Sequence, residues 1–252
     1  MATVNYNFKG EVLLVTGASS GIGRLVSQLF AENGGSVICV GRHPRRTTET
    51  VEFINKNLKG VAVPIIGDVA DPSTFDSAIE AANTLGGLNF AFNCAGAEGP
   101  LTPIHDTSQP SFIEMMNTKL LGCFLGMKAQ IAAMRASGGV IVNMVGTFGH
   151  IGYPYMGAYC AAAHGVLGLT RTAALEEGIN NIRVNAVCPG AVDTELLVRM
   201  MGGDRDAGLA IGDSTALGRV ATAEDVAGAV MYLLSDAASY VSGSSIMLDG
   251  GT

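Results

Sequence analysis

Short apolar runs alternate with longer segments of helical periodicity along the length of this chain. Parallel strands are buried on both faces and need a crossover helix to reach the next strand, so this alternation is typical of a parallel sheet covered by helices. It predicts an α/β fold with a doubly wound, seven-stranded parallel sheet. The expected strands are 12–16, 36–40, 61–66, 88–93, 139–145, 182–188 and 245–248.

Helices are expected between these strands, and two of them carry start signals. Asp71 precedes Pro72 and is a plausible N-cap with proline at the first helical position. Thr222 is followed three residues later by Asp225, which is close to a capping box. The expected helices are 21–33, 72–83, 109–137 (one helix or two), 159–177 and 223–234.

The composition favours one large domain, 1–252. The chain has 252 residues, of which 48% are hydrophobic and 15% charged, enough for a sizeable core and too apolar for disorder. The segment 191–217 has weak periodicity and several Gly and Asp residues. Long loops inside compact domains are usually functional, so we expect a mobile substrate lid here, with a disordered excursion as the alternative.

Charge and cysteine usage exclude several classes of function. The net charge of −7 argues against nucleic acid or an anionic membrane as a partner. The five cysteines are odd in number and lack CxxC spacing, which favours reduced thiols over disulfides or a metal site. The first residues show no secretory signal, and no apolar run reaches membrane-spanning length. We therefore expect a cytoplasmic protein without a metal.

A glycine-rich turn at 16–23 follows the first expected strand and opens the first expected helix. Gly17 permits a tight turn, Gly21 lets the backbone approach a pyrophosphate, and Gly23 allows close packing of helix on strand. The helix N-terminus offers N–H donors to phosphates. Together these features predict a dinucleotide site.

The spacing of this turn resembles the TGxxxGxG form of the short-chain dehydrogenase/reductase family, whose members have a Rossmann-type fold. Asp68–Val69, the 93–96 run, Asn117, Pro189–Gly190 with Thr194 and the ending at 241–251 occur in the family's order, so the resemblance spans about 8–251. It implies these cofactor-binding residues: Gly17, Ser19, Ser20, Gly21, Ile22, Gly23, Arg42, Asp68, Val69, Asn93, Ala95, Gly96, Tyr159, Pro189, Gly190, Val192 and Thr194. It also implies a small-molecule substrate and a homotetramer or homodimer.

The end of the second expected strand indicates which dinucleotide is bound. NAD sites normally place a carboxylate there, for the ribose 2′-hydroxyl. This chain has Gly41 followed by Arg42, and a guanidinium can pair with a 2′-phosphate. NADP is therefore favoured over NAD; the alternative is that Arg42, like Arg45 and Arg46, is a solvated surface residue.

The catalytic set implied by the resemblance is incomplete. The family uses Asn, Ser, Tyr and Lys together, with Lys one helical turn after Tyr. Asn117 and Tyr159 match, but the Ser position holds Gly146 and the Lys position holds Ala163. A free tyrosine is mostly neutral at pH 7 and a nearby cation would favour its phenolate, so loss of the lysine is expected to impair ordinary ketone reduction.

Other residues are candidates to substitute for the missing groups. His150 lies in a loop on the expected substrate side and can titrate near neutrality, so it is a candidate for catalysis or substrate binding, with a packed loop residue as the alternative. Weaker candidates are Thr147, His164 and Glu98, whereas Tyr153 and Tyr155 are expected to be pocket walls.

Three functions remain open on this basis. The first is an NADP(H)-linked oxidoreductase acting on a carbonyl, alcohol or activated substrate through an atypical proton relay. The second is a non-redox reaction on the same fold, such as cyclisation, isomerisation or elimination. The third is a non-catalytic dinucleotide-binding protein, including an engineered catalytic knockout, because fold alone does not fix function.

Overall fold

The computed structural model describes residues 6–97, 99 and 101–252 of the chain. These form a seven-stranded parallel sheet in the order β3-β2-β1-β4-β5-β6-β7, which confirms the predicted fold class. The order reverses between β1 and β4, the crevice position at which doubly wound sheets bind ligands. The strands are β1 Val12–Thr16, β2 Ser36–Gly41, β3 Ala62–Ile66, β4 Phe90–Asn93, β5 Gly139–Met144, β6 Ile182–Pro189 and β7 Ser245–Leu248.

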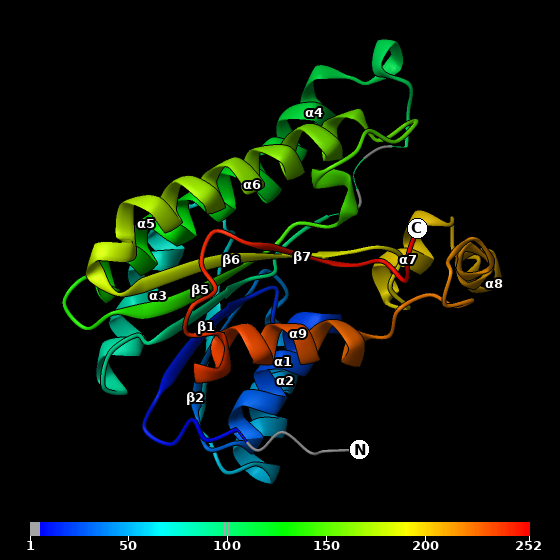
Figure 1. Ribbon diagram of the computed structural model, residues 1–252. Helices are drawn as coiled ribbons and strands as arrows, with labels where there is room; N and C mark the ends of the chain where they lie inside the picture. Colours follow the sequence, from blue (N-terminus) through cyan, green and yellow to red (C-terminus); the bar gives the residue numbers. More distant parts are fainter. Residues whose placement is uncertain (1–5, 98, 100) are drawn as a thin grey trace.

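Helices cover both faces of the sheet (Figure 1). One core cluster joins the sheet to α1, α2 and α9, and a second joins it to α3, α5 and α6. The helices are α1 Gly21–Glu32, α2 Pro44–Asn57, α3 Pro72–Thr84, α4 Gln109–Met115, α5 Gly122–Met134, α6 Gly157–Glu177, α7 Glu195–Met200, α8 Arg205–Ala210 and α9 Ala223–Leu234.

Strand β1 shows why a continuous apolar run forms this architecture. Leu13 and Val15 belong to the first core cluster, and Val12 and Leu14 belong to the second. Successive side chains of a strand point to opposite faces, so a central strand covered on both faces is a nearly continuous apolar run. All five residues of β1 are buried accordingly.

Both predicted helix starts are present. The Asp71 side chain accepts a hydrogen bond from the Ser73 N–H at 2.9 Å, with Pro72 at the start of α3. Thr222 and Asp225 form a complete capping box at the start of α9. Within the described residues, no helix combines the length and hydropathy needed to cross a membrane.

Helix α2 is an element that the sequence analysis did not predict. Its buried residues are Thr47, Thr50, Val51 and Ile54, so half of its buried face is threonine and its apolar periodicity is weak. Arg45 and Arg46 therefore lie in the first turn of a helix.

Two further segments differ in detail from the predictions. The expected 109–137 helix is α4 and α5 joined by a π-helical segment, Met116–Leu121. The segment 191–217 is not an irregular loop, because it contains α7, α8 and a short 3-10 turn, Ile211–Ser214. These helices are too short for amphipathic periodicity to reveal them.

Candidate active site

A large cavity of about 1800 Å³ opens at the carboxyl ends of the strands. The glycine-rich turn and the end of β2 line one part of it, and Tyr159, Phe148 and the 191–217 segment line another. Pockets for single small ligands usually measure about 300–1,000 Å³, so this cavity has room for a dinucleotide together with a substrate.

The glycine-rich turn is packed too closely for side chains. Gly17 has a φ of +73°, and a Cβ there would lie 3.1 Å from the Ala95 backbone. A Cβ on Gly23 would lie 2.4 Å from the Gly17 carbonyl oxygen. The Thr16 hydroxyl accepts hydrogen bonds from the Cys94 and Ala95 N–H groups, at 3.1 Å each. The turn and the end of β4 therefore form one tightly fixed backbone surface.

The N-terminus of α1 fits a phosphate group. Ser20 is its N-cap residue, but the Ser20 side chain makes no capping hydrogen bond, and the first turn holds no acidic residue. The first N–H groups of a helix lack partners within the helix, and its dipole favours an anion at this end. The cavity reaches this point, so the residues present fit the pyrophosphate of a dinucleotide.

The end of β2 places Arg42 and Arg46 on the cavity wall. Arg42 Nη1 lies 3.6 Å from Asp68 Oδ2, in a half-exposed ion pair. Arg46 pairs at 2.8 Å with Glu195 and so links α2 to α7. At Gly41 a Cβ would lie 2.4 Å from Thr47 Oγ1, which leaves no room for the carboxylate side chain of a typical NAD site without a local shift.

Tyr159, on α6, reaches the cavity beside the end of β5. Its hydroxyl donates a hydrogen bond to the Val145 carbonyl oxygen at 3.3 Å, and its ring meets Phe148 edge-on at 6.0 Å. A Cβ on Gly146 would lie 3.2 Å from the Tyr159 hydroxyl, so position 146 does adjoin the phenol. Gly146 has a φ of +93°, a conformation that disfavours any replacement side chain.

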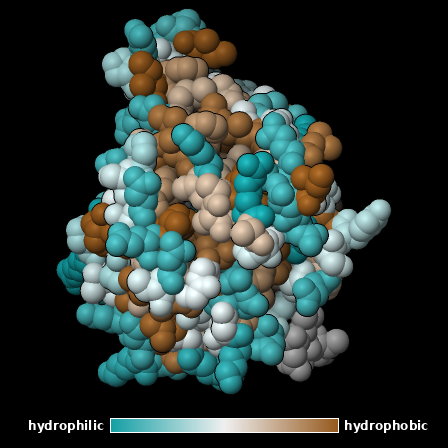
Figure 2. Space-filling model, turned by 90° about the vertical axis from the view of Figure 1, so that its left-hand side faces the viewer, coloured by the Kyte–Doolittle hydropathy of each residue, from teal (hydrophilic) through white to brown (hydrophobic). Residues whose placement is uncertain are grey.

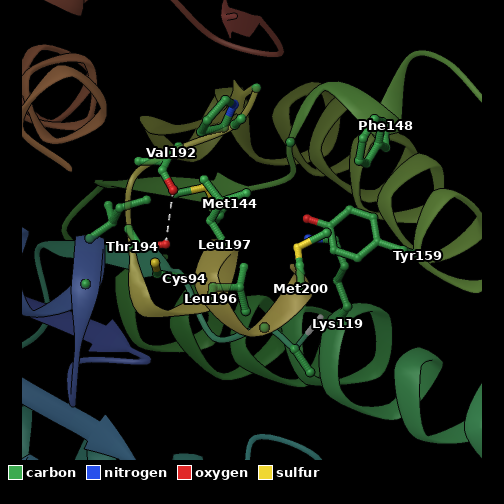
Figure 3. Close-up of a pocket in the computed structure, with 18 of the residues that line it drawn as sticks. Cys94, Lys119, Met144, Phe148, Tyr159, Val192, Thr194, Leu196, Leu197 and Met200 are labelled. Atoms are coloured by element: carbon green, nitrogen blue, oxygen red, sulfur yellow. Dashed lines mark hydrogen bonds between the residues drawn. The ribbon is translucent and has the colours of Figure 1, made fainter. Parts of the chain in front are cut away.

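Ala163 and Lys119 differ in whether they line the cavity. Ala163 is fully buried in the second core cluster and does not line the cavity. Lys119 lines the cavity, and its Nζ lies over the Tyr159 ring, 4.4 Å from the ring centroid. Figure 3 shows the Lys119 side chain reaching from its helix toward Tyr159. A lysine from a different helix therefore places a positive charge beside the phenol.

The π-helical segment explains which residues of this helix face the cavity. Asn117 is exposed and lies in a separate shallow hollow that also contains Arg42 and Asp68, whereas Lys119 is 4% exposed. A π turn inserts an extra residue and so changes the face on which later residues lie. The structure thus does not bring Asn117 to Tyr159, contrary to the sequence-based expectation.

Three thiols near Lys119 are uncharged at neutral pH. Burial raises the pKa of Cys94 and of Cys123 to about 12 and that of Cys188 to about 11, although the Lys119 charge acts in the opposite direction on all three. Desolvation disfavours the thiolate and outweighs the attraction of the ammonium. These cysteines therefore do not neutralise Lys119.

Asn93 is placed beneath the site rather than in it. It is buried and exchanges hydrogen bonds with Gln130, at 3.0 and 2.8 Å, and its amide donates to Asn143 at 2.9 Å. Asn143 in turn donates to Thr170 at 2.9 Å. This buried network joins β4, β5, α5 and α6, and fully paired polar networks of this kind fix the position of the elements they join.

Of the other residues expected at the site, some lie outside the large cavity and the rest line it. His150 is exposed, Asp68 lies in the shallow hollow, and neither lines the large cavity. His164 is tied to the Cys160 carbonyl oxygen at 2.9 Å, and Glu98 lies outside the described residues. The remaining expected residues line the cavity: Gly17, Ser19, Ser20, Gly21, Ile22, Gly23, Arg42, Val69, Ala95, Gly96, Thr147, Tyr153, Tyr155, Tyr159, Pro189, Gly190, Val192 and Thr194.

Helix α7 and its surroundings cover the cavity with apolar side chains. Leu196, Leu197, Met200 and Met201 all line it. Figure 3 shows Leu196, Leu197 and Met200 with Thr194, whose hydroxyl donates to the Val192 carbonyl oxygen at 3.3 Å. The substrate end of the cavity is therefore largely hydrophobic.

Lys119 is a site residue that was not predicted from the sequence, although its spacing in the chain indicates a buried position. Lys119 lies four residues after Met115 and four before Cys123, and both of these are buried. Residues four apart share a helix face, so this spacing indicates a lysine on the buried side. Lysine is rarely fully buried without a partner, which makes such a position a functional candidate.

Comparisons with known proteins agree with this geometry. Residues 17–252 match the family model described as enoyl-(acyl carrier protein) reductase. The chain is 38% identical to 2,5-dichloro-2,5-cyclohexadiene-1,4-diol dehydrogenase of Sphingobium indicum, over 97% of this chain and 98% of that protein. It is 35% identical to cyclohexanol dehydrogenase of an Acinetobacter species, over 96% and 95%.

A solved structure shows the same fold. Carveol dehydrogenase from Mycobacterium avium, in complex with NAD, has a TM-score of 0.91 and 29% identity to this chain, covering 96% of this chain and 97% of that one. Similarity of fold, family model and relatives extends over nearly the whole chain. The protein belongs to the short-chain dehydrogenase/reductase family of oxidoreductases.

Proposed function

We propose that the protein is a nicotinamide-dinucleotide-dependent oxidoreductase that interconverts a cyclic secondary alcohol and its ketone. The observation that carries this proposal is that one cavity joins the glycine-rich turn to Tyr159. The apolar lining from α7 suits an alicyclic ring, and relatives named for cyclohexadienediol and cyclohexanol support that substrate class.

The proposed cofactor supplies or accepts the hydride, and the protein binds and orients the reactants. In this proposal the turn at Gly17–Gly23 and the α1 N-terminus hold the phosphates. The segment from Pro189 to Thr194 holds the nicotinamide end, and the Tyr159 hydroxyl exchanges a proton with the substrate oxygen. The relay is atypical, because Gly146 and Ala163 give Tyr159 neither a hydroxyl nor a cation.

A substrate panel tests this function. Cyclohexanols and cyclohexanones of increasing ring substitution are assayed with NADP(H) and NAD(H), following absorbance of the reduced nicotinamide. We expect stereospecific turnover of at least one cyclic alcohol. Turnover that persists without any nicotinamide would favour a non-redox reaction, and tight dinucleotide binding with no turnover would favour a non-catalytic role.

We also propose that NADP is the preferred dinucleotide, because Arg42 and Arg46 line the cavity beside the end of β2. Arg42→Ala should weaken NADPH binding roughly tenfold and leave NADH binding nearly unchanged, since a charge-assisted hydrogen bond contributes about 1.5–3 kcal/mol and Arg42 is half-exposed. Calorimetric titration with both dinucleotides measures this.

Arg45→Ala is the matched control, because Arg45 is 91% exposed and pairs with Glu49 on its own helix. The proposal is contradicted if NADH binds more tightly than NADPH and Arg42→Ala weakens the binding of neither dinucleotide. NAD, which is bound in the carveol dehydrogenase structure, would then be the preferred cofactor.

The family resemblance further suggests a homotetramer or homodimer, and we propose such an assembly through α5 and α6. Figure 2 shows apolar side chains gathered on the upper half of one face, over the layer that holds α4, α5 and α6. Exposed apolar residues of this layer include Leu121, Phe124 and Leu175. Light scattering on the purified protein should give a dimer or tetramer mass; a monomer at micromolar concentration contradicts the proposal.

The segment 191–217 is proposed to be a substrate lid. Its apolar residues line the cavity, and the Arg46–Glu195 ion pair joins it to α2. Amide hydrogen exchange in this segment should slow when dinucleotide and substrate bind, because a closed lid opens less often. Unchanged exchange in the ternary complex would contradict a moving lid.

A further inference from the structure

Lys119 is a cation on the cavity wall that forms no ion pair within the described residues. Its side chain is 4% exposed, and its ammonium lies over the Tyr159 ring at 4.4 Å from the centroid. In the described part of the chain, no carboxylate pairs with Lys119 and no side chain or carbonyl accepts a hydrogen bond from it. A charged side chain that faces a ligand cavity without an ion-pair partner is a candidate for a role in binding or catalysis.

The neighbouring groups cannot supply the missing negative charge. Cys94, Cys123 and Cys188 feel the field of Lys119, yet burial keeps their thiols protonated at neutral pH. Position 146 is a glycine that offers no hydroxyl beside the phenol. No described carboxylate forms an ion pair with Lys119, so an anion that forms or binds in the cavity would be its partner.

We propose that Lys119 is a catalytic residue that acts with Tyr159, supplying from the α4–α5 helix the positive charge that Ala163 cannot supply from α6. This inference rests on the proposed oxidoreductase function and names a second charged group at the same site. Lys119 and Tyr159 both line the cavity, so in this proposal the substrate oxygen meets the ammonium as well as the phenol.

In the direction of ketone reduction, the proposed step forms a C–H bond and an O–H bond on the substrate. A bound reduced nicotinamide would supply the hydride to the ketone carbon and would itself be oxidised. The C=O π electrons move to the oxygen, which takes the proton of the Tyr159 hydroxyl and becomes the alcohol. Tyr159 is left negatively charged beside the Lys119 ammonium until a proton from solvent restores the phenol. Preorganised charge at the site where negative charge develops is a large term in catalysis.

Lys119→Met tests this role, because methionine keeps the length and apolar stem of lysine and removes the charge. We expect kcat to fall roughly 10²–10³-fold with KM changed much less. Lys119→Arg, which keeps the charge, should retain at least tenfold more activity than Lys119→Met. Lys128→Met is the matched control, since Lys128 is exposed on α5, and it should behave as wild type.

Thermal unfolding distinguishes a catalytic role of Lys119 from a purely structural one. The Lys119 ammonium reaches the cavity and forms no ion pair, so Lys119→Met should leave the Tm unchanged or slightly raised while kcat falls. A structural lysine would instead lower the Tm when removed. A Lys119→Met variant that loses stability, or that keeps kcat within about threefold of wild type, overturns the proposal.

A binding readout without nicotinamide completes the test. Para-nitrophenol is a phenol whose anion absorbs at longer wavelength than its neutral form, so its spectrum reports which form is bound. The wild-type protein and Lys128→Met should bind it as the anion, and Lys119→Met should bind it at least tenfold more weakly or in neutral form. Equal binding of the anion by all three overturns the role of Lys119. If the wild-type protein oxidises no alcohol, the proposed function is wrong. The para-nitrophenol titration still shows whether Lys119 binds a phenolate anion.

Discussion

Tyr159→Phe is expected to lower kcat roughly 10²–10⁴-fold while dinucleotide binding changes little. The substitution removes one oxygen atom and keeps the ring that contacts Phe148 and Lys119. The glycine-rich turn is untouched, so the variant should fold and bind NADPH as the wild type does. Steady-state kinetics and calorimetric titration on the same preparation separate the two effects.

Tyr240→Phe is the control for this prediction, because Tyr240 is fully exposed and does not line the cavity. Near-normal turnover in Tyr159→Phe would move the proton donor to another group. A shape-driven, non-redox reaction would then become the stronger interpretation, since it needs no hydroxyl at this position.

Gly23→Ala should weaken dinucleotide binding at least 100-fold, a loss of about 2.7 kcal/mol or more. The added Cβ would lie 2.4 Å from the Gly17 carbonyl oxygen and 2.9 Å from its carbon, so the turn backbone must move. A displaced turn no longer presents its N–H groups where the phosphates are expected. Overpacking of this kind costs about 1–3 kcal/mol, which lowers the Tm by several degrees in a domain of this size.

Gly228→Ala provides the matched comparison, because Gly228 lies in α9 with nothing within 4 Å of the added Cβ. It should leave NADPH binding unchanged and leave stability equal or raised by about 0.5–1 kcal/mol. Calorimetry and thermal unfolding of both variants measure these effects. If Gly23→Ala binds NADPH as well as Gly228→Ala does, the turn does not hold the phosphates.

Local pattern was enough to predict the sheet and much of the nucleotide site. The strand β1 is apolar at every position except Thr16, and a Cβ on Gly23 would meet the Gly17 carbonyl oxygen of the same turn. Asp71 and Thr222 each cap a helix through residues at most three positions away. Such features depend on neighbours in the sequence, so the sequence alone determined them.

Features that depend on contacts between distant residues were decided by the tertiary structure. Helix α2 is held by packing of a mostly polar segment on the sheet, and Asn93 is paired with Gln130 and Asn143 from other elements. The sequence itself shows glycine at 146 and alanine at 163. It does not show which charged residue lies beside Tyr159. Lys119 reaches the phenol from 40 positions earlier in the sequence, because a π turn rotates Asn117 to the surface and places the lysine against the α6 tyrosine. Sequence spacing fixes which residues share a turn, whereas only the packing of one helix on another fixes which charge meets which ring.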